Sequence, residues 1–179
     1  TQAKTLFPYT TLFRSHDSEN YGTGTGLSRV DSQTVIATLQ ERLSALNDLH
    51  LTLKHVHWNV VGPNFISVHE MLDPQVALVR GYADELAERI STLGGSPDGT
   101  PDAIEKDRSW DNYELRRAPA QKHLAALDAV YAGIIASHRA AIDVTGPIDP
   151  VTQDIVITQT AELEKFQWFI HAHLARDAE

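Results

Sequence analysis

The sequence contains no cysteine among its 179 residues. This absence excludes disulfide bonds, thiolate metal sites and a cysteine nucleophile, and it fits an intracellular protein. The chain also lacks any run of about 18 or more apolar residues, and its N-terminus lacks the continuous apolar segment of a secretory signal. We therefore expect a soluble, cytoplasmic protein without a membrane-spanning segment.

Positive charge is scarce as well. Lysine and arginine together number 15 against 24 aspartates and glutamates, which gives a formal net charge of −9. Binding to nucleic acid depends mainly on cations that neutralise phosphates, so this balance argues against a protein body that binds nucleic acid by itself. The length suits one domain that buries its own core.

The N-terminal segment shows an unusual resemblance. Residues 5–15, Thr-Leu-Phe-Pro-Tyr-Thr-Thr-Leu-Phe-Arg-Ser, resemble the in-frame translation of a common sequencing-library adapter. We interpret residues 1–15 as a non-native artefact, the alternative being a genuine unstructured arm. Without Lys4 and Arg14 the net charge falls from −9 to −11. Residues 16–30, with three glycines among polar neighbours, are expected to form a flexible arm.

Apolar residues recur every three or four positions in four long segments, and no segment shows a convincing strand pattern. Glycine and proline mark the ends of these segments, as at Gly62-Pro63 and Gly146-Pro147. Pro74 falls inside the second segment and should kink it. The pattern predicts helices over residues 32–61, 64–93, 116–144 and 149–175.

Residues 94–114 separate the second and third helices. They are rich in Gly, Pro and Asp and are too many for a hairpin turn, although residues 109–113 are expected to form one short helical turn. Connections that are short, long and short are typical of an all-α, ferritin-like four-helix bundle with one long crossover between helices two and three. We expect this domain over residues 31–176, followed by a short C-terminal end at 177–179.

Two histidines flank the tight turn at Gly62-Pro63. His57 lies five residues before that glycine, and His69 lies five residues after the asparagine that follows the turn. At about 1.5 Å rise per residue, both imidazoles should lie roughly 7 Å from the turn. Asp73 follows His69 by four residues, on the same helix face. Two imidazoles and a carboxylate suit iron, manganese or zinc better than copper(I) or calcium.

A second acidic pair, Asp84 and Glu88, follows on the same helix. Like charges four residues apart mildly destabilise a helix, so the pair needs a partner; in a purely structural interpretation Arg80 supplies one to Asp84. Asp84 lies roughly 16 Å along the helix axis from Asp73 and roughly 22 Å from His69. One metal centre therefore cannot use all five side chains of a single chain.

Metal centres inside four-helix bundles commonly use Glu-x-x-His motifs, and this sequence has none. Two arrangements remain that use all five groups: two separate half-sites, or one site completed across a two-fold axis by a second subunit. Antiparallel pairing of the second helix brings the His69/Asp73 end of one chain opposite the Asp84/Glu88 end of the other. We predict the intersubunit site.

The combined motif runs through both groups of residues. It reads His57-Trp58-Asn59-x-x-Gly62-x-x-Phe65-x-x-x-His69-x-x-x-Asp73, then Asp84-x-x-x-Glu88-Arg89 and Leu93-Gly94-Gly95-x-Pro97-x-Gly99-Thr100. In this motif the chain, from about residue 28 to 175, resembles the Dps family, the DNA-binding proteins from starved cells, and most of all its actinobacterial members. The resemblance implies a ferroxidase that oxidises Fe(II), preferentially with hydrogen peroxide. It also implies storage of Fe(III) mineral in a hollow dodecamer that protects against oxidative damage.

The resemblance also assigns roles to single residues. It makes His57, His69 and Asp73 iron ligands from one subunit and Asp84 and Glu88 ligands from the two-fold mate, with two iron ions, Fe2+ or Fe3+, per site. All five matching positions hold the residue type that the family pattern expects. The expected partners are therefore iron, hydrogen peroxide and further copies of this chain.

Weaker signals concern residues around this centre. Trp58, beside His57, is either a redox-active neighbour that quenches stray oxidising equivalents or an apolar filler at the dimer interface. Asp149 and Asp154 resemble acidic residues that line a three-fold pore for iron, although Asp149 also suits the N-cap of the fourth helix. Four further histidines are interpreted as structural or solvent-facing: His50, His55, His171 and His173.

Family members that bind DNA commonly do so with tails rich in lysine and arginine. Here the chain ends His173-Leu-Ala-Arg-Asp-Ala-Glu179, and the arm at 16–30 carries Asp17 and Glu19 against Arg29. Direct DNA binding is therefore doubtful. A nucleoid or DNA-binding protective protein with little iron oxidation is the alternative function, and a metal-free structural bundle is the third possibility.

Overall fold

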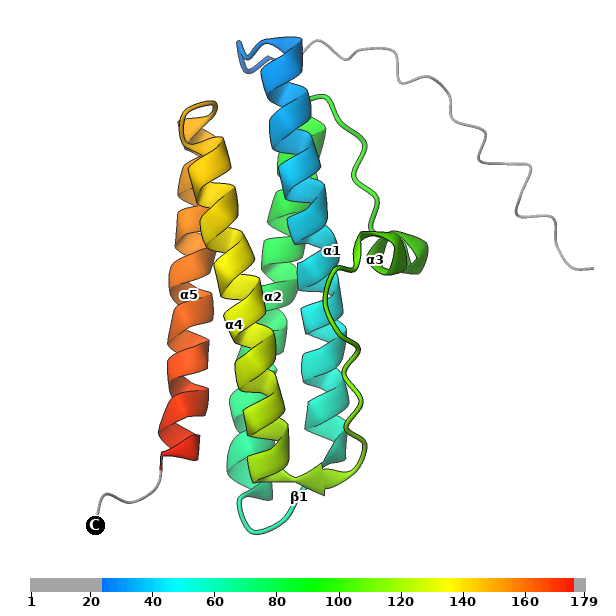
Figure 1. Cartoon of the computed structure of the whole chain (residues 1–179), viewed down its shortest axis with the longest axis vertical. Coiled ribbons are helices and arrows are strands. Elements are labelled where there is room, and N and C mark those ends of the chain that lie inside the picture. The colour runs from blue at the N-terminus through cyan, green and yellow to red at the C-terminus, as the bar shows by residue number, and fades with distance from the viewer. Residues whose placement is uncertain (1–23, 176–179) are drawn as a thin grey trace, which may run out of the picture.

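The protein forms a bundle of four long helices, shown by a computed structural model that describes residues 24–175 (Figure 1). The predictions for residues 1–15, for 16–23 of the arm and for 177–179 lie outside the described residues. The elements in chain order are α1 (Arg29–Asn59), β1 (Val60–Val61), α2 (Phe65–Thr92), α3 (Pro101–Asp107), β2 (Ala118–Pro119), α4 (Ala120–Thr145) and α5 (Pro150–Leu174).

The long helices form two antiparallel hairpins, α1 with α2 and α4 with α5, whose turns lie at opposite ends of the bundle (Figure 1). The crossover from α2 to α4 runs along the outside of the bundle and carries α3 partway along its course. This order confirms the all-α class and the long crossover between the second and third long helices. None of the helices within residues 24–175 is long and apolar enough to cross a membrane.

Local residues explain where the helices start and stop. The Ser28 side chain accepts a hydrogen bond from the backbone N–H of Asp31 and caps α1. Gly62 and Gly94 have φ values of 109° and 85°, a left-handed region that favours glycine and ends α1 and α2. Pro150 occupies the first turn of α5, as expected. The helix α2 continues unbroken through Pro74.

The core consists mainly of leucine, isoleucine and valine from all four long helices. Its largest fully buried side chains are Tyr131, Leu39, Leu46, Leu49, Leu53, Leu72, Leu86, Ile90, Leu93, Leu124, Leu127 and Leu163. The Tyr131 hydroxyl donates a 2.7 Å hydrogen bond to Gln75 Oε1, which joins α4 to α2 inside the bundle. Of the five candidate ligands only His57 is buried, so the other four lie outside this core.

The prediction of a helical turn at 109–113 was wrong, and the crossover helix lies earlier, at Pro101–Asp107. Thr100 caps α3 by accepting from the backbone N–H of Ala103, and Pro101 fits its first turn. The residues after α3 instead lie along α1. Arg108 Nη2 and Trp110 Nε1 both donate hydrogen bonds to the Asp48 carboxylate of α1, at 2.6 and 2.7 Å.

The expectation of no strand was also wrong, although each strand has only two residues. The strands β1 and β2 pair in parallel, with Val60 opposite Ala118 and Val61 opposite Pro119. This pairing explains why α4 begins at Ala120 rather than at the predicted residue 116. Pairs this short leave no alternating pattern in the sequence. They tie the end of the crossover to the α1–α2 turn, next to His57.

Candidate metal centre

His57 and His69 lie face to face across the α1–α2 turn. Their ring centroids are 3.6 Å apart and the ring planes differ by 23°. His57 belongs to the last turn of α1, and His69 lies near the start of α2, where the Phe65 ring packs 5.0 Å from it. The equal depth predicted from the helical rise is therefore observed.

Each histidine is hydrogen-bonded to the backbone of the other. His57 Nδ1 lies 3.1 Å from the carbonyl oxygen of His69, and His69 Nδ1 lies 2.9 Å from the carbonyl oxygen of His57. A carbonyl oxygen only accepts, so both Nδ1 atoms carry the hydrogen. In the neutral ring this assignment leaves the Nε2 lone pair of each imidazole free for a metal ion.

The Asp73 carboxylate joins this pair from α2. Its Oδ1 lies 3.3 Å from His57 Nδ1 and 3.3 Å from Lys54 Nζ. The side chain is 56% exposed, so the carboxylate stays open to solvent. The sequence interpretation missed Lys54, although its position three residues before His57 places it on the same face of α1.

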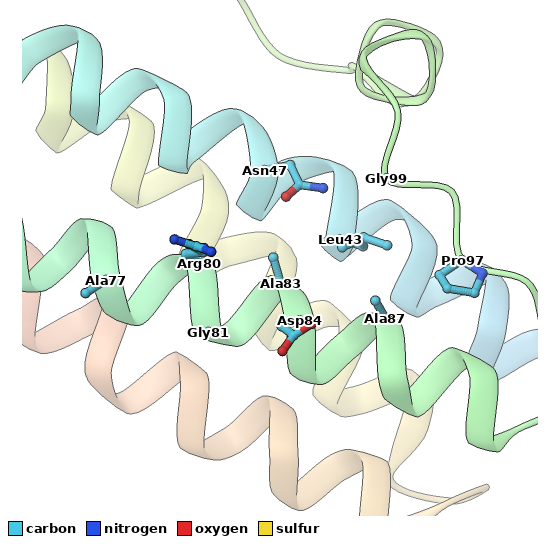
Figure 2. Close-up of a pocket in the computed structure, with 10 residues that line it drawn as sticks. All are labelled: Leu43, Asn47, Ala77, Arg80, Gly81, Ala83, Asp84, Ala87, Pro97 and Gly99. Atoms are coloured by element: carbon cyan, nitrogen blue, oxygen red, sulfur yellow. The ribbon is translucent and has the colours of Figure 1, made fainter.

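Asp84 and Glu88 lie farther along α2 and are both exposed. Neither carboxylate takes part in an ion pair with another described residue. The side chains of Arg80 and Asp84 point in different directions in Figure 2. The structural interpretation, in which Arg80 neutralises Asp84, therefore has no support, and the two carboxylates are free to bind a cation.

Asp84 borders a groove of about 620 Å³ between α1, α2 and the crossover (Figure 2). Small residues line much of the groove on α2, among them Ala77, Gly81 and Ala87. A Cβ atom added at Gly81 would meet no atom within 4 Å. The backbone of α2 is thus accessible along this face, which another helix could approach closely.

Within residues 24–175 no three His, Asp or Glu side chains converge on one metal position. His57, His69 and Asp73 lie close together. The Oδ1 atom of Asp73, however, faces Lys54 Nζ and His57 Nδ1 rather than a free Nε2 atom. The acidic pair lies roughly 16 Å or more along α2 from Asp73 and His69. A single chain therefore presents two partial sites.

The structure places the two pore candidates very differently. Asp149 is 4% exposed and accepts a 2.6 Å hydrogen bond from Arg89 Nη2. Burial alone would raise the pKa of Asp149, but hydrogen bonds from Thr152 and Arg89, with the charge of Arg89, hold this pKa below its usual value. Its position at the N-cap of α5 is confirmed, whereas a carboxylate bound inward to Arg89 does not fit a pore lining. Asp154 is exposed and remains a candidate.

The other aromatic and histidine candidates have separate environments. Trp58 is 70% exposed, and Lys54 Nζ lies 5.8 Å from its ring centroid. His55 Nε2 lies 2.7 Å from the carbonyl oxygen of Leu115, which fits a structural role. His171 pairs with Asp128 on the surface, away from the α1–α2 turn.

The bundle with its single long crossover defines a ferritin-like protein, and the ferritin-like domain profile matches residues 36–179. The chain is 63% identical over 149 residues to the DNA protection during starvation protein of Mycolicibacterium smegmatis, covering 83% of this chain and 81% of the relative. The solved structure of Mycobacterium smegmatis Dps in its tetragonal form matches at 61% identity with a TM-score of 0.86, covering 87% of this chain and 94% of that one. DpsA14 from Streptomyces coelicolor matches at 55% identity and a TM-score of 0.86, covering 88% and 94%. The chain therefore belongs to the Dps family, as its motif predicted.

Proposed function

We propose that this protein is a ferroxidase that oxidises Fe(II), preferentially with hydrogen peroxide, and stores the Fe(III) mineral in a hollow cytoplasmic dodecamer. The observation that carries the proposal is the reciprocal hydrogen bonding of His57 and His69, which frees both Nε2 atoms beside an exposed carboxylate. Removal of ferrous iron and peroxide together would protect the cell from oxidative damage.

Antiparallel pairing of α2 about a two-fold axis would complete the centre. The midpoint of positions 69 and 88 is also the midpoint of positions 73 and 84. A single two-fold axis at this point brings His69 opposite Glu88 of the second copy and Asp73 opposite Asp84 of the second copy. Ala77 and Gly81 of the groove lie between the two groups, where the copies must approach each other. This common midpoint supports an intersubunit site.

The proposed ligands suit the reaction. Imidazole nitrogens and carboxylate oxygens bind ferrous iron and stabilise the ferric state. Two ferrous ions each lose one electron, and hydrogen peroxide takes both electrons with two protons as its O–O bond breaks to give two water molecules. Two iron ions bound in one site supply both electrons together, so no hydroxyl radical needs to be released. Hydrolysis of ferric iron then yields the mineral and releases protons.

Two further residues belong to this proposal. Trp58 is exposed beside His57, so it is placed to accept stray oxidising equivalents or to fill the interface between copies. Asp154 is exposed on α5 and would line the pore through which iron enters. A carboxylate there would attract cations toward the interior of the particle.

Anaerobic addition of Fe(II) to the purified protein, followed by peroxide at about one molecule per two iron ions, should give a ferric core inside the particle. Ferric absorbance, iron content and light scattering on one size-exclusion peak would measure oxidation, retention and mass together. Oxygen alone should act more slowly than peroxide. Ferric iron that precipitates outside a particle of any size would contradict the storage function.

Direct DNA binding is the second candidate function, because the M. smegmatis relative is named for DNA protection. The net charge of −9 opposes it, since phosphate contacts require cations. We expect no gel retardation of plasmid DNA by the iron-free particle at low salt. The same particle should still limit cleavage of that plasmid by Fe(II) and peroxide. Retardation that disappears as salt is raised would instead support a nucleoid-binding role.

A further inference from the structure

The hairpin half of the proposed centre consists of His57, His69 and Asp73. Lys54 lies within this half, although its ammonium group cannot bind a metal ion. The Nζ atom is 3.3 Å from Asp73 Oδ1 and 5.8 Å from the Trp58 ring centroid. The Lys54 side chain is only 25% exposed, so solvent and salt screen its charge less than at an open surface. A fixed positive charge therefore contacts a carboxylate that the proposed function assigns to iron.

The distribution of charge differs between the two halves of the proposed centre. Asp73 already has the Lys54 ammonium and the His57 ring as partners in its own chain. Asp84 and Glu88, in contrast, form no ion pair with any described residue. The hairpin half is therefore nearly neutral before a metal ion binds. The acidic half, Asp84 and Glu88, has no positive partner among the described residues to balance its charge.

We infer that Lys54 sets the metal affinity of the hairpin half, because its ammonium occupies Asp73 and an incoming divalent cation must exchange with it. This inference rests on the proposed function. After the exchange the ammonium stays close to the bound dication, and the like charges repel. The hairpin half alone then binds metal loosely, and firm binding requires the two carboxylates of a second copy. Lys54 is thus a positioning residue that restricts metal loading to assembled subunits.

The charge of Lys54 predicts the size of the effect. Even when screened by the dielectric constant of water, a unit charge and a dication roughly 6 Å apart change a dissociation constant by about tenfold. Lys54→Met and Lys54→Gln both remove the charge, and only the second keeps a hydrogen-bond donor. Both variants should therefore bind a divalent metal about tenfold more tightly, whereas Lys54→Arg should resemble the parent.

Cobalt(II) is a suitable probe, because its visible absorption reports nitrogen and oxygen ligands without iron oxidation. Assembled parent and variants would be titrated with cobalt(II) against a chromophoric chelator, with light scattering to verify equal particle mass. Lys122→Met is the matched control, since Lys122 is an exposed lysine on α4 with no role in the centre. This control should bind cobalt(II) like the parent.

The outcomes separate the inference from the function on which it rests. Tighter binding by Lys54→Met and Lys54→Gln, but not by Lys54→Arg, supports a competing charge. Unchanged or weaker binding by the two uncharged variants overturns the inference while the ferroxidase proposal stands. A parent that neither binds cobalt(II) nor oxidises ferrous iron overturns the proposed function itself.

Discussion

The double variant Asp84→Asn with Glu88→Gln will oxidise Fe(II) no faster than the reaction in free solution, while its subunits stay folded. Both carboxylates are exposed and form no ion pair with a described residue, so neutralising them removes no observed contact. It even relieves a like-charge repulsion of a few tenths of a kcal/mol, about the size measured for such helix pairs. Stopped-flow ferric absorbance would give the rate, and circular dichroism with light scattering would report fold and assembly.

A matched control neutralises two carboxylates outside the proposed centre. Asp143→Asn on α4 with Glu105→Gln on α3 makes the same change in charge at exposed positions. This control should keep the parental rate, because no ligand is lost. Equal rates in the parent and in the Asp84/Glu88 variant would show that the acidic pair does not bind the reacting iron.

Mixed particles would test whether the two half-sites come from different chains. A subunit with His57→Gln and His69→Gln lacks the hairpin ligands but keeps the acidic pair, and the Asp84/Glu88 variant has the opposite defect. When the two are co-assembled in equal amounts, half of the two-fold pairs are mixed and each mixed pair holds one intact site out of two. Activity should therefore return to about one quarter of the parental rate, although each variant alone is inactive. Mixed particles that remain inactive would indicate a site within one chain.

The sequence predicted the four long helices and the meeting of His57 with His69, because both depend on regular local geometry. A fixed rise per residue places two side chains at equal distance from a turn at the same depth. The left-handed conformation at Gly62 and the N-terminal proline of α5 are likewise local signals. The reciprocal hydrogen bonds between the two histidines follow once that turn has formed.

The course of the crossover depends on contacts between distant residues, which local patterns do not contain. Asp48 on α1 binds Arg108 and Trp110, some 60 residues later, and Ser44 donates to Asp107. The start of α3 was nevertheless visible in Thr100-Pro101, a cap followed by proline, and it was overlooked. A single capping signal, rather than a regular apolar pattern, marks the start of α3.

The environments of charged side chains could not be predicted for the same reason. Asp149 pairs with Arg89, 60 residues away, so its acidic character alone did not reveal that its carboxylate is buried and bound inward. Lys54 contacts Asp73 only because the α1–α2 turn brings the two helices together. Residue type and helical spacing identify potential ligands, whereas the partner that each charge finds is determined by packing.

Gly81→Leu is expected to abolish both assembly and iron oxidation without unfolding the subunit. Leucine is a better helix former than glycine by roughly 0.5–1 kcal/mol, and a Cβ at this position meets no atom of its own chain within 4 Å. The added side chain would, however, project into the groove where a second α2 must approach closely. Light scattering should show particles much smaller than a dodecamer, and ferric absorbance should develop only at the solution rate.

Gly133→Leu gives the matched comparison, because Gly133 is also an exposed glycine inside a helix whose added Cβ meets nothing within 4 Å. It lies on α4, away from the groove, so this variant should assemble and oxidise iron like the parent. If Gly81→Leu also assembles and oxidises iron normally, α2 cannot be the two-fold contact. The His57 and His69 half-site would then have to find its remaining ligands on another surface, because its own chain holds Asp84 and Glu88 too far along α2 to supply them.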